Sequence, residues 1–242
     1  MDEPQPALRS TARATLRRKR ERGHHDRAAV DAILDEAFVC HVGFRDGEGV
    51  AVLPTAYARV GDSLYLHGAA ANHMLRALGD GAPACVTVTL VDGIVLARSA
   101  FHHSMNYRSV VLFGPAARVD DPDEKRRALL AIVDHVTPGR STDARPPTES
   151  ELRATAVVRF PIDEGSAKVR TGGPVEEPED LDLPVWAGEI PLALAVGDPQ
   201  PDAGVDGVVA VPAYVSGFRR PASPAPAHPS SADPARPPAP GG

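Results

Sequence analysis

The sequence predicts a mainly β fold, a small closed or split barrel of six short antiparallel strands with peripheral helices. Short runs rich in β-branched residues, among them Val50 to Ala58, are separated by turn residues, as in antiparallel barrels. Hydrophobic residues make up 43% of the 242 residues and aromatic residues only 5%, so Val, Leu, Ile and Ala must build the core. The motifs G-x-G-x-x-G, G-x-x-x-x-G-K and G-x-S-x-G do not occur, and strands and helices do not alternate strictly. These two observations exclude a Rossmann fold.

The elements of the barrel follow one another in chain order. Asp26 can cap a first helix, in which Val30, Ile33 and Leu34 form an apolar stripe. A short helix around residues 72–78 interrupts the strands, and a longer helix begins at 121–122 and ends at about 135. The predicted strands are residues 38–44, 50–58, 63–67, 83–91, 94–101, 107–119 and, after the longer helix, 154–162.

Two of these strands carry a further prediction each. The dipeptide Asp92-Gly93 is a strong two-residue hairpin signal, and it joins the fourth and fifth predicted strands. The sixth strand has apolar residues on both faces, Val110 and Leu112 on one and Val111 and Phe113 on the other. A strand buried on both sides suggests that one face lies against a partner subunit, so we expect a homodimer.

The two ends of the chain differ in composition from the part between them. Residues 1–25 crowd basic side chains together and predict a disordered basic arm, with a nucleic-acid-binding arm as the alternative. Residues 219–242, with eight prolines, predict a disordered tail. Between them, residues 26–195 form the barrel domain and 196–218 an extended segment. The acidic, Pro-rich stretch around Trp186 is expected to lie extended over the barrel.

Charge and cysteine content exclude several classes of protein. A net charge of −6 argues against a nucleic-acid-binding protein, which needs a basic surface to displace counterions. Cys40 and Cys85 lie in apolar runs without a C-x-x-C partner, so we expect buried thiols and neither a zinc site nor a redox motif. No apolar stretch approaches the ~18–20 residues needed to span a bilayer, and the N-terminus lacks an apolar signal region. We therefore expect a cytoplasmic protein without membrane contact.

Two ordered blocks of sequence resemble a known family. The first block comprises residues 52–58 (VLPTAYA), 64–68 (LYLHG) and 72–75 (NHML). The second runs from Val91-Asp92-Gly93 through residues 106–111 (NYRSVV) to Gly114. Over about residues 27 to 195 the chain resembles the pyridoxamine-phosphate-oxidase-like, FMN-binding split-barrel family, in its flavin-nucleotide-binding or nitroimidazole-resistance-like branch.

The resemblance implies a six-stranded split barrel of the FMN-binding type, working as a homodimer with FMN in a groove at the subunit interface. Ser109 would approach the flavin from the partner chain. A corner between a strand and the following helix would receive the phosphate, where a helix N-terminus presents N–H donors. The strand against the flavin ring would contribute Leu53, Pro54, Thr55 and Tyr57, and the phosphate corner would contribute His67, Gly68, Ala69, Asn72 and His73.

One departure from the family concerns the phosphate corner. Many relatives have a Ser-Arg-Lys type of box where this chain has Asn72-His73-Met74, so a fixed cation is missing and His73 with Arg76 would balance the phosphate. Haem is an alternative cofactor, with His67, His73 or His102 as the single axial ligand, and a deazaflavin is another. The adjacent His102 and His103 point to opposite faces of an extended segment, so a metal site is not expected.

Two functions follow from the resemblance. The first is an FMN-dependent oxidoreductase, in which the flavin carries the redox chemistry and the protein orients it, so that no acid–base residue needs to be recognisable. Its substrate is open, and a nicotinamide nucleotide or another small molecule would supply electrons. The alternative is a non-enzymatic carrier or sensor that binds flavin, deazaflavin or haem.

Overall fold

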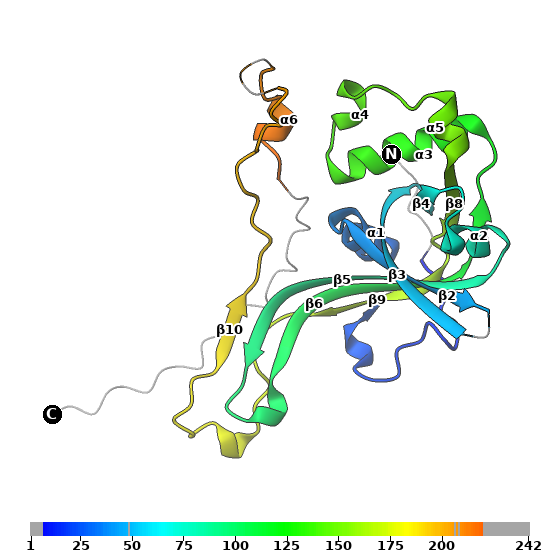
Figure 1. Ribbon diagram of the computed structural model, residues 1–242. Helices are drawn as coiled ribbons and strands as arrows, with labels where there is room; N and C mark the ends of the chain where they lie inside the picture. Colours follow the sequence, from blue (N-terminus) through cyan, green and yellow to red (C-terminus); the bar gives the residue numbers. More distant parts are fainter. Residues whose placement is uncertain (1–6, 48, 206, 208, 220–242) are drawn as a thin grey trace.

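The computed structural model describes residues 7–47, 49–205, 207 and 209–219, and its main feature is one curled sheet whose strand ladders are antiparallel (Figure 1). The sheet has the strand order β1-β9-β6-β5-β2-β3-β4-β8-β7, and β10 pairs with β5 outside this path. The predicted mainly β split barrel with peripheral helices is confirmed. The strands are β1 (Gly23–His24), β2 (Val39–Asp46), β3 (Gly49–Val60), β4 (Ser63–Ala69), β5 (Pro83–Leu96), β6 (Ser104–Pro115), β7 (Ala117–Arg118), β8 (Thr155–Pro161), β9 (Glu164–Arg170) and β10 (Gly188–Pro191).

Helices surround this sheet and close the barrel. The first begins where the sequence predicts, because the Asp26 carboxylate accepts a hydrogen bond from Ala29 N at 2.9 Å. Its stripe of Val30, Ile33 and Leu34 is buried in the main apolar core. The helices are α1 (Arg27–Glu36), α2 (His73–Gly79), α3 (Pro122–Val136), α4 (Arg140–Asp143), α5 (Glu149–Ala154) and α6 (Ala213–Ser216), with 3-10 turns η1 (Arg20–Arg22), η2 (Ala100–His102) and η3 (Pro178–Asp180).

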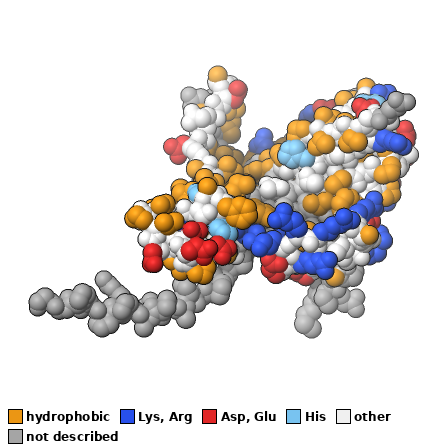
Figure 2. All heavy atoms as spheres, turned by 90° about the horizontal axis from the view of Figure 1, so that it is seen from below, with side chains coloured by type: hydrophobic (Ala, Val, Ile, Leu, Met, Phe, Trp, Pro, Cys, Tyr) orange, Lys and Arg blue, Asp and Glu red, His pale blue; other side chains and the backbone are white. Residues whose placement is uncertain are grey.

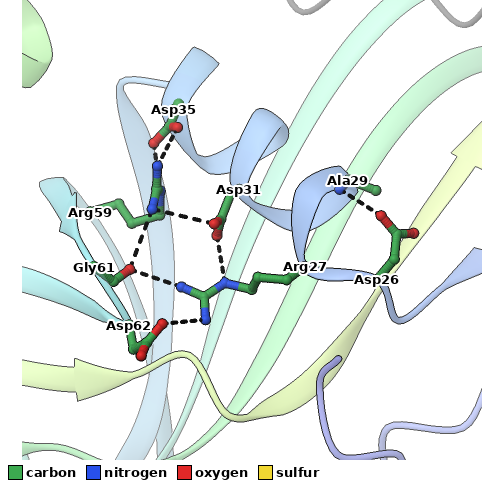
Figure 3. A network of polar contacts seen from close by, with 8 residues as sticks. All are labelled: Asp26, Arg27, Ala29, Asp31, Asp35, Arg59, Gly61 and Asp62. Carbon is green, nitrogen blue, oxygen red and sulfur yellow. Dashed lines mark hydrogen bonds and ion pairs between the residues drawn. The ribbon is translucent and has the colours of Figure 1, made fainter. Parts of the chain in front are cut away.

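A network of charged side chains fixes α1 to the turn between β3 and β4 (Figure 3). Arg27 is almost fully buried and contacts Asp31 and Asp62, each at 2.7 Å. Arg59 of β3 contacts Asp35 at 2.6 Å and Asp31 at 3.3 Å. Each guanidinium therefore has carboxylate partners from the same chain, which balance its positive charge.

The strand β3 is where the barrel splits. Its residues Gly49 to Ala56 pair with β2, whereas Tyr57 to Val60 pair with β4. The strand thus leaves one half of the sheet and enters the other between Ala56 and Tyr57. On the side of β3 that faces β4, residues 49–56 have no ladder partner in the described parts of the chain.

The hairpin predicted at Asp92-Gly93 is wrong, because residues 83–96 form one long strand. The ladder between β5 and β6 runs along this strand with a register shift between Val91 and Gly93. Gly93 pairs with Asn106 of β6 on one side and with Pro191 of β10 on the other. The local turn signal is therefore used as a β-bulge inside a strand that has partners on both sides.

The N-terminal segment also differs from its prediction as a disordered arm. Leu8 is 4% exposed and Ala14 is 2% exposed. Arg13 forms an ion pair with Glu164 at 2.6 Å, and Leu8 N donates to His25 O. Residues 7–25 therefore pack against the barrel, along β9. The sequence does not predict β9 itself, since EGSAKVR has no run of β-branched residues.

The C-terminal part runs along one side of the barrel after β10 (Figure 1). It returns to the helical side, where Phe218 lies next to Phe38 with 6.5 Å between ring centroids. Tyr214 donates to Asp143 and accepts from Arg140. Of the predicted disordered tail 219–242, residues 220–242 lie outside the described residues. No helix in the described ranges is long and apolar enough to cross a membrane.

Candidate functional site

The unpaired edge of β3 provides the polar backbone groups of the candidate site. Leu53 is 42% exposed, and Pro54, which points to the opposite face of the strand, is exposed as well. Both faces of β3 are therefore accessible at this point. Thr55 is half-buried, and its hydroxyl donates to Ala56 O at 3.3 Å. Since residues 53–56 have no ladder partner toward β4, backbone N–H and C=O groups there face the gap. A planar molecule with a polar edge could bind these groups.

The corner between β4 and α2 closes one end of this gap. Gly68 is held close to the helix, since a Cβ there would lie 3.0 Å from Leu75 Cδ1. The Asn72 carboxamide caps α2 by accepting from Leu75 N at 3.0 Å, and Asn72 N donates to Ala69 O. Asn72 therefore holds the corner together, and its side-chain oxygen is engaged within the helix.

His73 is the exposed member of this corner. Its Nε2 lies 2.6 Å from Asp46 Oδ1 at the end of β2, and its ring lies 6.3 Å from that of Phe44. An anion at this corner would therefore meet a histidine that is already paired with a carboxylate. This arrangement orients His73 but offsets the charge that it could offer to a phosphate.

His67 lies at the same end of β4 but points away from the barrel interior, beneath α3. It lines a cavity of about 290 Å³ together with apolar residues of α3, including Leu129 and Val133, and with Glu151. Its Nδ1 is buried and has no hydrogen-bond partner among the residues that the structure describes. Burial lowers the pKa of His67 below 6.5. The imidazole is therefore neutral at pH 7 and has a ring nitrogen available to a ligand.

Two predicted site residues lie away from this gap. Tyr57 is fully buried, and its hydroxyl donates to Leu34 O at 2.5 Å, so its side chain belongs to the core. Ser109 on β6 is separated from β3 by β2 and β5, which amounts to about 14 Å at a strand spacing of about 4.8 Å. Within one chain, residues 53–55 and 67–73 belong to neighbouring strands and the helix that follows, whereas Ser109 lies three strands away from β3.

The outer face of the sheet is open and largely apolar. A groove of about 800 Å³ crosses it, lined by Val52, Cys85 and Phe113 and flanked by Arg13, whose guanidinium lies 5.0 Å from the Phe113 ring. Val39, Val50 and Val91 on the same sheet are also exposed. Val111 belongs to the second apolar face of β6, the face that led us to expect a partner subunit. It lies on this side of the sheet, between Thr87 and Ser166.

The two cysteines and His102 lie outside the candidate site. Cys40 is buried, and burial raises the pKa of its thiol to about 12. Burial also raises the pKa of the half-buried Cys85. His102 lies near the tip of the long β5–β6 ribbon, 3.4 Å from Glu177. Within the described ranges, no three His, Cys, Asp or Glu side chains come together as metal ligands.

The sequence did not predict the walls of the His67 cavity. They come from α3, from the loop at Arg145 and Pro147, and from α5, which begins with Thr148 and Glu151 in a capping box. The pattern T-x-x-E was present in the sequence and is a recognised helix start, so α5 could have been found. The contact between this loop and β4 could not, because it joins residues far apart in the chain.

Comparisons with known proteins agree with this geometry. A family model described as pyridoxamine 5′-phosphate oxidase matches residues 26–169. Among curated proteins, none matches. The flavocytochrome Anf3 from Azotobacter vinelandii is 38% identical, with a TM-score of 0.82, over 86% of this chain and 97% of that one.

Two further solved structures are similar to this chain. The FAD and haem binding protein from Mycobacterium smegmatis is 36% identical, with a TM-score of 0.78, over 81% of this chain and 96% of that one. A protein described as a 5-nitroimidazole antibiotic resistance protein, from Bacteroides thetaiotaomicron, is 28% identical, with a TM-score of 0.51, over 61% of this chain and 86% of that one.

Proposed function

The chain belongs to the pyridoxamine 5′-phosphate oxidase family, and from that premise we propose that it is a flavin-dependent oxidoreductase that works as a homodimer. The observation that carries the proposal is the split in β3. Residues 53–56 have no ladder partner on the side of β3 that faces β4 in the described structure, and β4 leads into the tight corner of Gly68 and Asn72. Two similar proteins are described by their names as a flavocytochrome and as an FAD and haem binding protein, which supports a flavin here.

The residues present fit a flavin. Leu53, Pro54 and Thr55 would lie against the ring and bind its polar edge through the backbone. Gly68 makes the tight corner possible, because a Cβ there would lie 3.0 Å from Leu75 Cδ1, so a larger residue would push α2 away from β4. When bound, the flavin supplies the redox chemistry, and the chain orients it and excludes water. The flavin is FMN or FAD, with a deazaflavin as a variant. The electron donor is a nicotinamide nucleotide or another small molecule, and the location is cytoplasmic.

The spectrum of the purified protein and one pair of glycine variants test the flavin site. We expect a yellow protein, and Gly68→Val should weaken flavin binding roughly tenfold or more, since overpacking costs about 1–3 kcal/mol. Gly79→Ala, at the end of the following helix, is the control, because its Cβ would make ordinary contacts with Arg118 Cβ at 3.5 Å and Val158 Cγ1 at 3.9 Å. A colourless protein that does not bind added FMN or FAD would refute the proposal.

The homodimer rests on the open outer face of the sheet. Val111 lies on this face of β6, beside Thr87 and Ser166. Val111→Asp should convert the dimer to a monomer at micromolar concentration, because it would bury an unpaired charge in the interface. Sedimentation equilibrium measures this directly. A monomeric wild-type protein would contradict the proposed homodimer. It would also contradict the role of Ser109 as a residue that the partner presents to the flavin.

Haem binding is a second candidate function, and His67 favours it. His67 is neutral, lies in a largely apolar cavity and keeps Nδ1 free of hydrogen bonds in the described structure, whereas His73 and His102 lie next to carboxylates. We propose His67 as the axial ligand. The cavity of about 290 Å³ is small for haem, so the loop at Arg145 would have to move. His67→Ala should abolish a Soret band that His102→Ala leaves intact.

A further inference from the structure

A charged pocket lies at the end of β9. Arg170 is 5% exposed, although it has no carboxylate within ion-pair distance in the described structure. Its guanidinium donates to neutral acceptors instead: Asn106 Oδ1, Gly172 O at 2.7 Å and Gly173 O at 2.9 Å. Gly172 has a φ of 92°, which lets the chain curl around the guanidinium. The two terminal nitrogens of the Arg170 guanidinium therefore have neutral acceptors, whereas its buried Nε has no hydrogen-bond partner among the described residues.

A second guanidinium approaches this one. Arg22, at the end of η1, lines a cavity of about 310 Å³ together with Arg170, His24 and Glu21. Burial lowers the pKa of Arg170, and the like charge of Arg22 lowers it further, against the opposing effect of Glu189. The Glu189 carboxylate does not pair with Arg170 directly. It accepts a hydrogen bond from the Asn106 side chain, which in turn accepts one from Arg170. Two cations thus share a cavity in which Glu21 is the only acidic lining residue.

The surroundings of the cavity are also basic. Arg17, Arg18, Lys19 and Arg20 precede Arg22 in the same segment, and none of them forms an ion pair within the described ranges. Figure 2 views the molecule from below, the side on which the N-terminal segment lies in Figure 1, and shows a band of Lys and Arg side chains there. A local excess of positive charge in a chain of net charge −6 points to an anionic ligand.

We propose that the cavity formed by Arg22, His24 and Arg170 binds the phosphate or diphosphate group of a nucleotide. Guanidinium groups bind phosphate oxygens through paired hydrogen bonds, and an anion between Arg22 and Arg170 would relieve their repulsion. The cavity has room for more than an inorganic phosphate, and Val169 and Val175 give it an apolar wall that suits part of a nucleoside. The ligand is a nicotinamide nucleotide, the electron donor of the proposed function, and this choice of ligand rests on that function.

The primary test measures ADP binding by calorimetry and needs neither flavin nor activity. We expect wild-type protein to bind ADP more tightly at low salt, and Arg22→Gln to weaken binding about tenfold, as expected for a charge-assisted hydrogen bond. Arg17→Gln is the matched control, since it removes the same charge from an exposed residue of the same segment that does not line the cavity. His24→Ala gives a second cavity variant that leaves both guanidinium groups in place.

The outcomes separate this proposal from the flavin proposal. If Arg22→Gln raises the KM for a nicotinamide nucleotide and leaves FMN and FAD binding unchanged, the cavity holds the donor; if it weakens FAD but not FMN, this choice of ligand is overturned. ADP binding that persists in a protein unable to bind flavin would leave the cavity proposal standing. The proposal is overturned if wild-type protein does not bind ADP, or if Arg22→Gln and Arg17→Gln bind it equally.

Discussion

The molecule contains two arginine clusters of opposite design. In the network at α1, Arg27 and Arg59 have carboxylates of Asp31, Asp35 and Asp62 as partners (Figure 3). In the cavity at β9, the Arg170 guanidinium donates to two backbone carbonyls and one carboxamide, and Arg22 forms no ion pair within the described residues. The first cluster balances its charges within the chain and holds the fold. The second leaves positive charge unbalanced, which costs stability unless an anion arrives.

The contrast also divides the N-terminal segment. Arg9 and Arg13 are paired with Asp163 and Glu164, at 2.6 Å in each case, and they fasten the segment to the barrel. The basic residues that follow, from Arg17 to Arg22, form no ion pair in the part of the chain that the structure describes. The ion pairs of Arg9 and Arg13 therefore hold the segment in place and so position the unpaired basic residues that follow.

The largest effect is expected from breaking the paired network. Arg27→Ala should destabilise the fold by about 2–3 kcal/mol, because removing one partner of a buried ion pair leaves Asp31 without its closest cation. Urea unfolding followed by circular dichroism measures this loss. ADP affinity should stay unchanged in this variant. A loss below about 0.5 kcal/mol would mean that α1 is held by its apolar stripe alone.

A smaller effect is expected where the N-terminal segment is fastened. Hydrogen bonds from Arg13 and Thr11 lower the pKa of Glu164 from 4.5 to about 2. A carboxylate whose pKa is lowered in the folded state adds stability above pH 4.5, and this stability is lost as the pH falls toward 2. Glu164→Gln should therefore be less stable than wild type at pH 7, and the two melting curves should converge near pH 2. Curves that stay parallel over this range would show that the contact does not stabilise the fold.

The fastened segment also changes an expectation drawn from composition. Deleting residues 1–22 should leave stability nearly unchanged if the segment is disordered. Because Leu8 and Ala14 are buried, this deletion should instead cost at least about 2 kcal/mol, most of it from Leu8. Seven basic residues indicated a solvated arm, and the few apolar residues between them were too sparse to predict a docking site.

Periodicity and turn residues predicted the barrel strands and α1, α2 and α3, because these elements bury regular apolar stripes. They failed where long-range pairing decides the structure. Asp92-Gly93 forms a bulge, since β10, about a hundred residues further on, pairs across Gly93. The strand β9 has little β propensity and exists through its pairing with β6 and β1.

The candidate site was predictable to a similar extent. The block that contains Pro54 was predicted as a strand and the block that contains Gly68 as a strand followed by a short helix, and both elements are present in the structure. They could not show that Tyr57 points into the core or that His73 is paired with Asp46, because both depend on contacts between separate strands and helices. Arg170 was missed together with β9, the strand that carries it.

The smallest effect is expected from Arg22 in the absence of ligand. Arg22→Gln removes a charge that repels Arg170, so stability should change by no more than about 0.5 kcal/mol and should rise slightly at low salt.

The addition of ADP should make wild type and Arg22→Gln differ in stability. At an ADP concentration 100 times the wild-type Kd, wild-type protein gains about 2.7 kcal/mol by mass action. A variant that binds tenfold more weakly gains only about 1.4 kcal/mol under the same conditions. Thermal melts with and without ADP should thus separate Arg22→Gln from Arg17→Gln, whereas the melts of the free proteins coincide. If Arg22→Gln were destabilised without ligand as strongly as Arg27→Ala, Arg22 would hold the fold, and the distinction between the two clusters would fail.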